Sequence, residues 1–154
     1  MTAWMIVEDD LTGPEIRSLL ELHFRGMLDN SPEGSCHFLD IDGLRQPDVT
    51  FWSIWNDRSL AGCGALRELD RDHGELKSMR TSPDHLGQGV GRQLLVHIID
   101  VARQREYGRV SLETGSSPAF DAARHLYDSF GFDECGPFGD YTPEPFSRFY
   151  TLEL

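Results

Sequence analysis

The chain has 154 residues, 39% hydrophobic and 26% charged, which fits one globular domain with a hydrophobic core and leaves no room for a second. Acidic residues outnumber basic ones by 26 to 14, and the net charge of -12 argues against nucleic acid as a partner but suits a cationic substrate such as an amine. The start lacks the basic and apolar regions of a signal peptide, and no apolar run is long enough to span a membrane. We therefore expect a single cytoplasmic domain over residues 1–154, without contacts to nucleic acid or membrane.

The first part of the chain predicts one strand and two helices. "AWMIVED" (3–9) is typical of a strand, and Pro14 suits the first turn of a following helix. That helix has apolar residues at helical spacing: Ile16, Leu19, Leu20, Phe24 and Met27. Turn-forming residues predict a loop at 29–35, and a short helix is expected at about 38–45.

Three strands are predicted next. "VTFWSIW" (49–55) and "SLAGCGALREL" (59–69) flank a turn and resemble an antiparallel hairpin. "GELKSMRTS" (74–82) alternates imperfectly, as a strand with a bulge does.

The second half alternates between helical and extended patterns. An apolar stripe predicts a helix from Gly89 to about Glu106, and "RVSLETG" (109–115) predicts a strand. A second amphipathic helix ends at Gly131, and two strands follow, "FDEC" and "RFYTLEL". The order of the elements predicts an α/β fold around a mixed sheet.

The stretch "DHLGQGVGRQLL" (84–95) sets three glycines, Gly87, Gly89 and Gly91, just ahead of this apolar stripe. The first amides of a helix have no partner inside it and lie at the positive end of its dipole, so bare backbone there can hold a diphosphate. A dinucleotide fingerprint would need a glycine where Arg92 stands, and the lysine of a P-loop is absent. The glycine pattern alone leaves open a tight turn that binds no ligand.

The surrounding sequence resembles a known family. "MRTSPDHLGQGVGRQLL" is similar to the pyrophosphate loop of the GNAT superfamily of acyl-CoA-dependent N-acetyltransferases, and "AARHLYDSFGF" is similar to its downstream helix. "ALRELD…GELKSMRTSP" and "LETGSSPAF…LYDSFGF…PFGDY" resemble a branch of small bacterial members with poorly defined substrates. The resemblance implies a mixed, mostly antiparallel sheet of six to seven strands, flanked by about four helices.

The resemblance also implies acetyl-CoA as cosubstrate, without a metal. Its pyrophosphate would lie on the backbone of Gly87, Gln88, Gly89, Val90, Gly91 and Arg92, and its pantetheine arm beside Met79, Arg80 and Thr81. Two positions depart from the family pattern. Leu86 stands where arginine or glutamine is usual, and Phe120 stands where asparagine is frequent.

The implied reaction is direct transfer of an acetyl group to an amine. An alkyl amine with a pKa near ~10.4 is unprotonated in only about one molecule in ~10³ at neutral pH, so a base is needed. Glu75, which resembles the position of a base in some family members, is one candidate base, and Glu113 on the neighbouring strand is the other; each is also compatible with a solvated or ion-paired strand carboxylate. Tyr127 matches the family tyrosine that protonates the leaving thiolate, although a core aromatic would produce the same pattern.

The acceptor pocket is the least defined part of the site. Loops at 29–38 and 138–147 border it in this fold, which makes Phe24, Tyr141 and Phe146 candidate walls. The acceptor is expected to be a small-molecule or peptide amine, and a homodimer is common in the family. A transferase for another acyl-CoA and a non-catalytic CoA-binding or regulatory module remain the alternatives.

The cysteines and histidines add little. Cys36, Cys63 and Cys135 lack the paired spacing of a metal site or a disulfide framework, which favours reduced thiols. Among the histidines only His85, beside the glycine stretch, is a candidate phosphate contact. The sequence therefore predicts no metal site.

Overall fold

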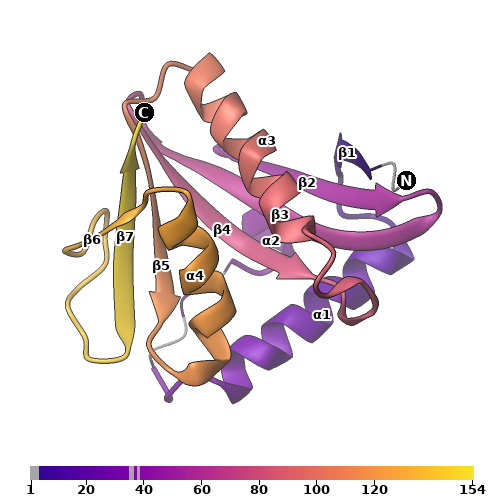
Figure 1. The fold of residues 1–154 in the computed structure, drawn as a ribbon, viewed down its shortest axis with the longest axis horizontal. Coiled ribbons are helices and arrows are strands. Elements are labelled where there is room, and N and C mark those ends of the chain that lie inside the picture. Colours follow the sequence, from indigo (N-terminus) through magenta and orange to yellow (C-terminus); the bar gives the residue numbers. More distant parts are fainter. Residues whose placement is uncertain (1–3, 35–36, 38) are drawn as a thin grey trace.

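A computed structural model of the chain describes residues 4–34, 37 and 39–154 (Figure 1). Its elements follow in the predicted order: β1 (Trp4–Glu8), α1 (Pro14–Asp29), α2 (Ile41–Leu44), β2 (Val49–Asn56), β3 (Ser59–Asp70), β4 (His73–Thr81), α3 (Val90–Gln104), β5 (Arg109–Gly115), α4 (Asp121–Ser129), β6 (Asp133–Cys135) and β7 (Ser147–Glu153). Two short 3₁₀ turns, Pro83–His85 and Pro118–Phe120, precede α3 and α4.

The strands form one seven-stranded sheet in the order β1-β2-β3-β4-β5-β7-β6. Every neighbouring pair is antiparallel except β4 and β5. Helices α3 and α4 lie on the near face of the sheet in Figure 1, and α1 and α2 lie behind it. The predicted α/β class, with a mostly antiparallel sheet and four helices, is confirmed.

Each face of the sheet has its own hydrophobic cluster. On one face, Leu94, Leu95 and Ile98 of α3 are fully buried against the central strands. On the other, Ile16 and Leu20 of α1 are buried in a second cluster. These are residues of the two apolar stripes, whose spacing of three and four brings them onto one helical face.

Strand β4 contains the predicted bulge. Cys63 of β3 pairs with Arg80, but Ala65 pairs with Lys77, so two residues of β4 stand opposite the single Gly64. One of the two, Ser78, has the left-handed φ of 57°. A Cβ on Gly64 would lie 2.5 Å from Met79 Sδ, so the glycine makes room for the Met79 side chain opposite the bulge. The bulge reverses the alternation of side chains along β4.

The parallel pair β4–β5 is short. Pairing covers only residues 73–75 of β4 and 109–111 of β5, although β4 continues to Thr81 and β5 to Gly115. Beyond these pairs the strands diverge (Figure 1). The sheet is therefore parted at its centre.

Some predicted boundaries were wrong. The helix expected at about 38–45 spans only Ile41–Leu44, because the Asp40 carboxylate accepts a hydrogen bond from the Gly43 amide (2.9 Å) and caps the helix there. Helix α3 ends at Gln104 rather than near Glu106, whose φ of 64° cannot continue a helix. Ala3 of the predicted first strand, Cys36 and Phe38 lie outside the described residues.

Two further observations concern the cysteines and the membrane. Cys63 and Cys135 are free thiols. Within the described part of the chain, no helix has the length and apolar character needed to cross a bilayer.

Candidate active site

The glycine stretch forms the start of α3. Gly89 is the N-cap, with a φ of 80° and no side-chain cap, and Gly87 has a φ of 75°. A Cβ on either residue would meet no atom within 4 Å, so open space lies in front of both. Gly91, in contrast, lies inside the helix rather than ahead of it, and its Cβ would be 3.2 Å from Leu126 Cδ2 of α4. Two glycines thus set the turn and the third allows α3 and α4 to approach.

This turn borders a cleft of about 470 Å³ between β4, the start of α3 and α4. The predicted cofactor residues that line it are Met79, Arg80, Thr81, Gly87, Gly89, Val90, Gly91 and Arg92. Gln88 is exposed and is not among the lining residues. Bare helix-terminal amides and open space fit the diphosphate of a CoA thioester.

The two positions that depart from the family pattern have clear surroundings. Leu86 borders the cleft with 66% of its surface exposed, so it presents an apolar side chain to solvent. The Phe120 ring packs edge-on against Phe146, with ring centroids 5.7 Å apart. A Cβ on Gly115 would lie 2.6 Å or less from both rings, so that glycine makes room for the pair.

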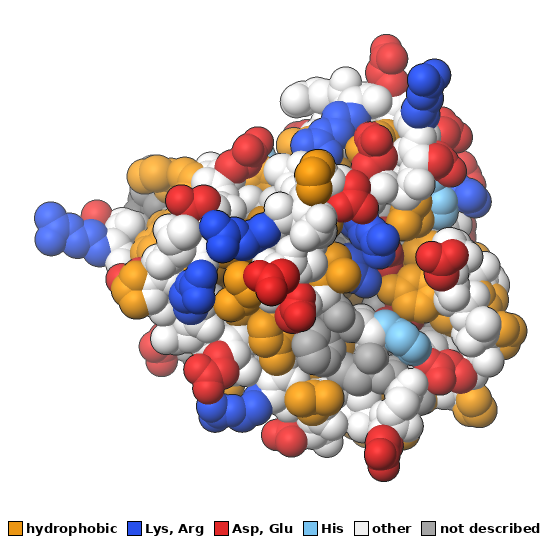
Figure 2. Space-filling view, turned by 180° about the vertical axis from the view of Figure 1, so that it is seen from behind, with side chains coloured by type: hydrophobic (Ala, Val, Ile, Leu, Met, Phe, Trp, Pro, Cys, Tyr) orange, Lys and Arg blue, Asp and Glu red, His pale blue; other side chains and the backbone are white. Residues whose placement is uncertain are grey.

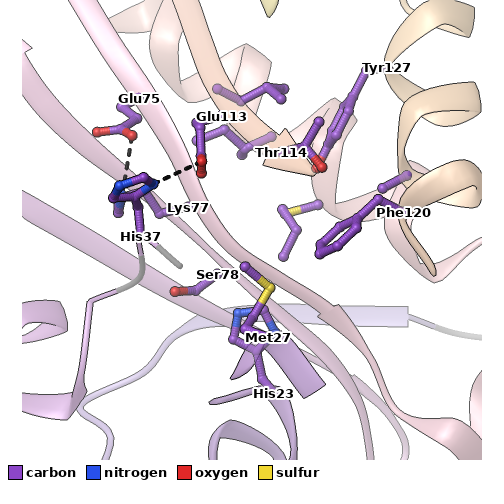
Figure 3. Close-up of a pocket in the computed structure, with 14 residues that line it drawn as sticks. His23, Met27, His37, Glu75, Lys77, Ser78, Glu113, Thr114, Phe120 and Tyr127 are labelled. Atoms are coloured by element: carbon purple, nitrogen blue, oxygen red, sulfur yellow. Dashed lines mark hydrogen bonds and ion pairs between the residues drawn. The ribbon is translucent and has the colours of Figure 1, made fainter. Parts of the chain in front are cut away.

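A smaller cavity of about 90 Å³, which we call the chamber, lies in the gap between β4 and β5. Its lining residues are His23, Met27, His37, Glu75, Leu76, Lys77, Ser78, Met79, Leu112, Glu113, Thr114, Phe120, Ala123 and Tyr127. Figure 3 shows the carboxylates and His37 at one end of it, and Tyr127 and Phe120 at the other. Met79, Ala123 and Tyr127 also line the cofactor cleft, so the two spaces adjoin.

Glu75 belongs to a closed hydrogen-bonded group. Its side chain is only 2% exposed, and its Oε2 accepts hydrogen bonds from the Tyr141 hydroxyl (2.5 Å) and Lys77 Nζ (3.2 Å). Lys77 Nζ also donates to the Tyr141 oxygen (3.0 Å). Burial and the neighbouring Glu75 carboxylate raise the pKa of Tyr141, so its hydroxyl remains protonated. All three groups are engaged with one another.

Glu113 is buried beside a histidine. Its Oε2 lies 3.0 Å from His37 Nδ1 and accepts a hydrogen bond from Ser147 Oγ (2.8 Å). Burial raises the pKa of Glu113, because the charged carboxylate loses hydration. Glu144 joins the group: its Oε1 lies 3.5 Å from His37 Nε2 and accepts from Ser147 Oγ (2.9 Å).

Tyr127 lies where the cleft and the chamber meet. It is 6% exposed, on the inner face of α4, with its ring centroid 5.6 Å from that of Phe132. Burial raises the pKa of Tyr127, so its hydroxyl carries a proton at neutral pH. The sequence alternatives of core aromatic and proton donor are compatible here, since a buried ring borders both spaces.

The structure places the three predicted acceptor walls in different surroundings. Tyr141 contacts Glu75 and Lys77 beside the chamber, whereas Phe24 packs on the second hydrophobic cluster and Phe146 packs on Phe120. The residues of α1 that line the chamber are His23, one position before Phe24, and Met27. Burial lowers the pKa of His23 to about 4, so this ring is neutral.

His85, the predicted phosphate contact, is buried at the edge of the cofactor cleft. Its Nε2 lies 3.3 Å from Ser59 Oγ, which fixes the ring from the side of β3.

A third space, which we call the vestibule, opens on the side of the sheet that α1 and α2 cover. It measures about 620 Å³ and shares His37, Glu75 and Lys77 with the chamber. Acidic and basic side chains are interspersed over this face (Figure 2). Cleft, chamber and vestibule therefore form a series of adjoining spaces from one face of the sheet to the other.

The two loops predicted to border the acceptor pocket, 29–38 and 138–147, contain His37, Glu144 and Ser147. Sequence patterns did not single out these three residues, because they lie far from Glu113 in the chain and their spacing carries no motif. Composition does draw attention to Lys77, because it is the sole lysine among 14 basic residues. That signal alone does not indicate a pocket.

One potential metal-binding group exists among the described residues. Single ligand atoms of His37, Glu113 and Glu144 all lie within 4.8 Å of one another. Hydrogen bonding of His37 and Ser147 to the two carboxylates accounts for this arrangement. The prediction of no metal site rests on spacing and stays a prediction.

Comparisons with known proteins agree with this geometry. A sequence model of the Acetyltransferase (GNAT) family matches residues 14–132. Bacillus subtilis YsnE, named an uncharacterized N-acetyltransferase, is 54% identical over 146 residues, or 95% of this chain and 97% of its own. Escherichia coli YedL, with the same description, is 51% identical over 149 residues, or 97% and 94% of the two chains.

Solved structures share the fold. An acetyltransferase from Streptococcus agalactiae matches with a TM-score of 0.77 at 20% identity, covering 98% of both chains. A GNAT family acetyltransferase from Elizabethkingia anophelis, solved with acetyl-CoA bound, matches with a TM-score of 0.67 at 22% identity, again over 98% of both chains. From the family match and the two close relatives, the chain belongs to the GNAT family of acetyltransferases and is an acyltransferase enzyme.

Proposed function

We propose that this enzyme moves an acetyl group from acetyl-CoA to a primary amine by direct attack, with both substrates bound at once. The observation that carries the proposal is the series of adjoining spaces across the parted sheet. A donor in the cleft and an acceptor in the vestibule would meet only at the chamber, between Tyr127 and Glu113. Bringing two reactants together in this way removes much of the entropic barrier to the reaction.

The donor site is assigned to the turn before α3. Amides from Gly87 to Arg92 would hold the diphosphate, and the edge of β4 at Met79 and Thr81 would hold the pantetheine amides. Acetyl-CoA supplies the activated thioester, and the protein orients it. The amide of Met79, beside the bulge, is the candidate hydrogen-bond donor to the thioester oxygen.

Glu113 is the better candidate base. Both carboxylates are buried. The charge of Glu75 is balanced by Lys77, and its Oε2 already accepts a hydrogen bond from Tyr141. Both hydrogen bonds to Glu113 end on Oε2, so Oε1 is not engaged by the residues that the structure describes. A raised pKa makes Glu113 a stronger proton acceptor than an exposed glutamate.

Protons and bonds balance with Tyr127 as the acid. A nitrogen–carbon bond forms and the carbon–sulfur bond breaks. A protonated alkyl amine first loses one proton to Glu113 and attacks as the free amine. The departing thiolate takes the hydroxyl proton of Tyr127, and the second proton that leaves the nitrogen restores that hydroxyl, so one net proton remains on Glu113 at each turnover. The raised pKa of Tyr127 keeps its hydroxyl proton in place until a strong base is generated beside it.

A screen of amines tests the proposal. Release of free thiol from acetyl-CoA is measured with each amine and without any, and the acetylated product is identified by mass. Acceleration by at least one primary amine is expected. Thiol release that no amine accelerates would refute N-acetyl transfer, and an O-acetylated or S-acetylated product would refute the amine as acceptor.

The small chamber also favours a short acyl group over other acyl-CoA donors. About 90 Å³ must hold the acyl group and the reacting amine together. We expect kcat/KM to fall steadily from acetyl-CoA to longer straight-chain acyl-CoAs.

A further inference from the structure

The group formed by Glu113, His37, Glu144 and Ser147 joins three segments of the chain. Glu113 belongs to β5, His37 to the loop after α1, and the other two to the start of β7 and the residues before it. His37 stands between the two carboxylates, with Nδ1 at 3.0 Å from Glu113 and Nε2 at 3.5 Å from Glu144. Each ring nitrogen therefore has its own carboxylate.

Exposure increases along this group. The Glu113 side chain is 5% exposed, whereas those of Glu144 and His37 are 23% and 35% exposed. His37 lines both the chamber and the vestibule. It is thus the link between a buried carboxylate and water.

The proposed reaction needs a route for a proton from the chamber to water. A base in the chamber receives one proton at each turnover and must lose it before the next. Glu75, Lys77 and Tyr141 also line the vestibule, but they are hydrogen-bonded to one another, and among the described residues no hydrogen bond joins them to Glu113. Ser147 can hold Glu113 in place, but its short hydroxyl does not reach the vestibule lining.

We propose that His37 carries the acceptor's proton from Glu113 to water. The proposal rests on the function proposed above. Rotation of the protonated Glu113 carboxyl group turns its proton toward His37. In the tautomer with its proton on Nε2, the ring accepts this proton at Nδ1 and releases the other from Nε2 toward Glu144 and the vestibule. One proton enters and one leaves, so the charge of His37 is unchanged. Exchange with water at its exposed edge then restores the tautomer.

Glu144 is a positioning residue in this scheme. Together with Ser147 it orients the outer nitrogen and attracts the departing proton. Other groups that face or influence the relay are the Tyr141 ring, 5.4 Å from the His37 ring, and Lys77, which acts on Glu113 electrostatically. The pH dependence of proton transfer through His37 therefore depends on all of these groups together.

The test compares two acceptors that differ in basicity. One is the best alkyl amine from the screen; the other is its alkoxyamine isostere, in which an oxygen beside the nitrogen makes the free base dominant at neutral pH. For His37→Ala, we expect kcat with the alkyl amine to fall roughly 10²-fold and kcat with the alkoxyamine to stay within about twofold. His125→Ala, which changes an exposed histidine of α4, should alter neither rate.

Imidazole provides the second readout. Added imidazole should restore part of the alkyl amine rate in His37→Ala and should leave Glu113→Gln inactive. Glu144→Gln should shift the pH profile of kcat without changing the KM for acetyl-CoA. A thermal shift with acetyl-CoA shows that each variant is folded.

The outcomes separate the two proposals. If His37→Ala retains the wild-type rate and pH profile with the alkyl amine, or loses activity equally with both acceptors, the relay is wrong although amine acetylation stands. If wild-type enzyme acetylates neither acceptor, the proposed function itself fails.

Discussion

At the scale of single residues, Tyr127 is the proposed proton donor and lines both the cleft and the chamber. We predict that Tyr127→Phe lowers kcat by about 10²-fold and leaves the Kd for acetyl-CoA nearly unchanged, because only the proton donor is lost. Steady-state kinetics and calorimetry give the two numbers. Tyr107→Phe is the matched control, since Tyr107 is equally buried but donates its hydroxyl to Glu68, away from the chamber. An unchanged kcat in Tyr127→Phe would remove this tyrosine from the mechanism.

His23 makes a prediction about acid stability. Burial holds its folded pKa at about 4, below its ordinary value of 6.5, so between these values the unfolded chain takes up a proton that the folded chain does not. Folding is therefore weakened as pH falls from about 6.5 to 4, by roughly 3 kcal/mol for this residue.

Urea unfolding of wild type and His23→Leu at pH 7 and pH 4 measures the effect. The variant should lose less stability on acidification, whereas His125→Leu should follow wild type. Parallel losses in wild type and His23→Leu would contradict a neutral buried ring.

The candidate residues were found from sequence to very different degrees. Tyr127 and the glycine stretch stand in local motifs, so the family resemblance could place them by number. Sequence offered both Glu75 and Glu113 as candidate bases, and the proposal favours Glu113 because Lys77 and Tyr141 occupy Glu75. His37 meets Glu113 across 76 positions of sequence, a proximity that only tertiary packing creates.

At the scale of elements, the start of α3 carries the donor site. We predict that Gly89→Glu lowers acetyl-CoA affinity by 10²-fold or more, about 3 kcal/mol, because a carboxylate would enter the space assigned to the diphosphate. Calorimetric titration with acetyl-CoA measures it.

Gly89→Ala is the matched control for this substitution. Both variants place a Cβ on a residue with a φ of 80°, so both lose about 1–2 kcal/mol of folding stability. Only the charged variant should lose most of its affinity. Equal affinities in the two variants would show that the diphosphate lies elsewhere.

Element order and type were predictable because the apolar stripes of α1 and α3 and the two apolar runs that flank the β2–β3 turn are strong local signals. The residues at which elements begin and end were less predictable. The capping carboxylate of Asp40 and the reversed φ of Glu106 decide two of them, and neither follows from hydrophobic periodicity. The bulge in β4 was visible as a break in alternation, but its fit to Gly64 on the next strand was not.

At the scale of the whole molecule, the sheet consists of two antiparallel halves joined by a short parallel seam. The seam spans residues 73–75 and 109–111, and both substrate spaces adjoin the gap beyond it. Composition and element order cannot reveal such a gap, because the gap begins where the hydrogen-bonded pairing between β4 and β5 ends. Only the register of β4 and β5 shows where the gap begins.

This arrangement predicts that the donor substrate stabilises the entire fold. A ligand that lies across the gap bonds to β4 and α3 on one side and contacts α4 on the other, so it joins the two halves. At a concentration of about 100 times its Kd, acetyl-CoA should add roughly 2.7 kcal/mol, which for a chain of this size raises Tm by about 5–10 °C. S-acetylpantetheine, which lacks the diphosphate, should give a much smaller shift at the same concentration. Hydrogen exchange should slow in residues 76–81 and 112–115 with acetyl-CoA. Slowing confined to the α3 turn, with the two strands unaffected, would mean that the donor does not enter the gap.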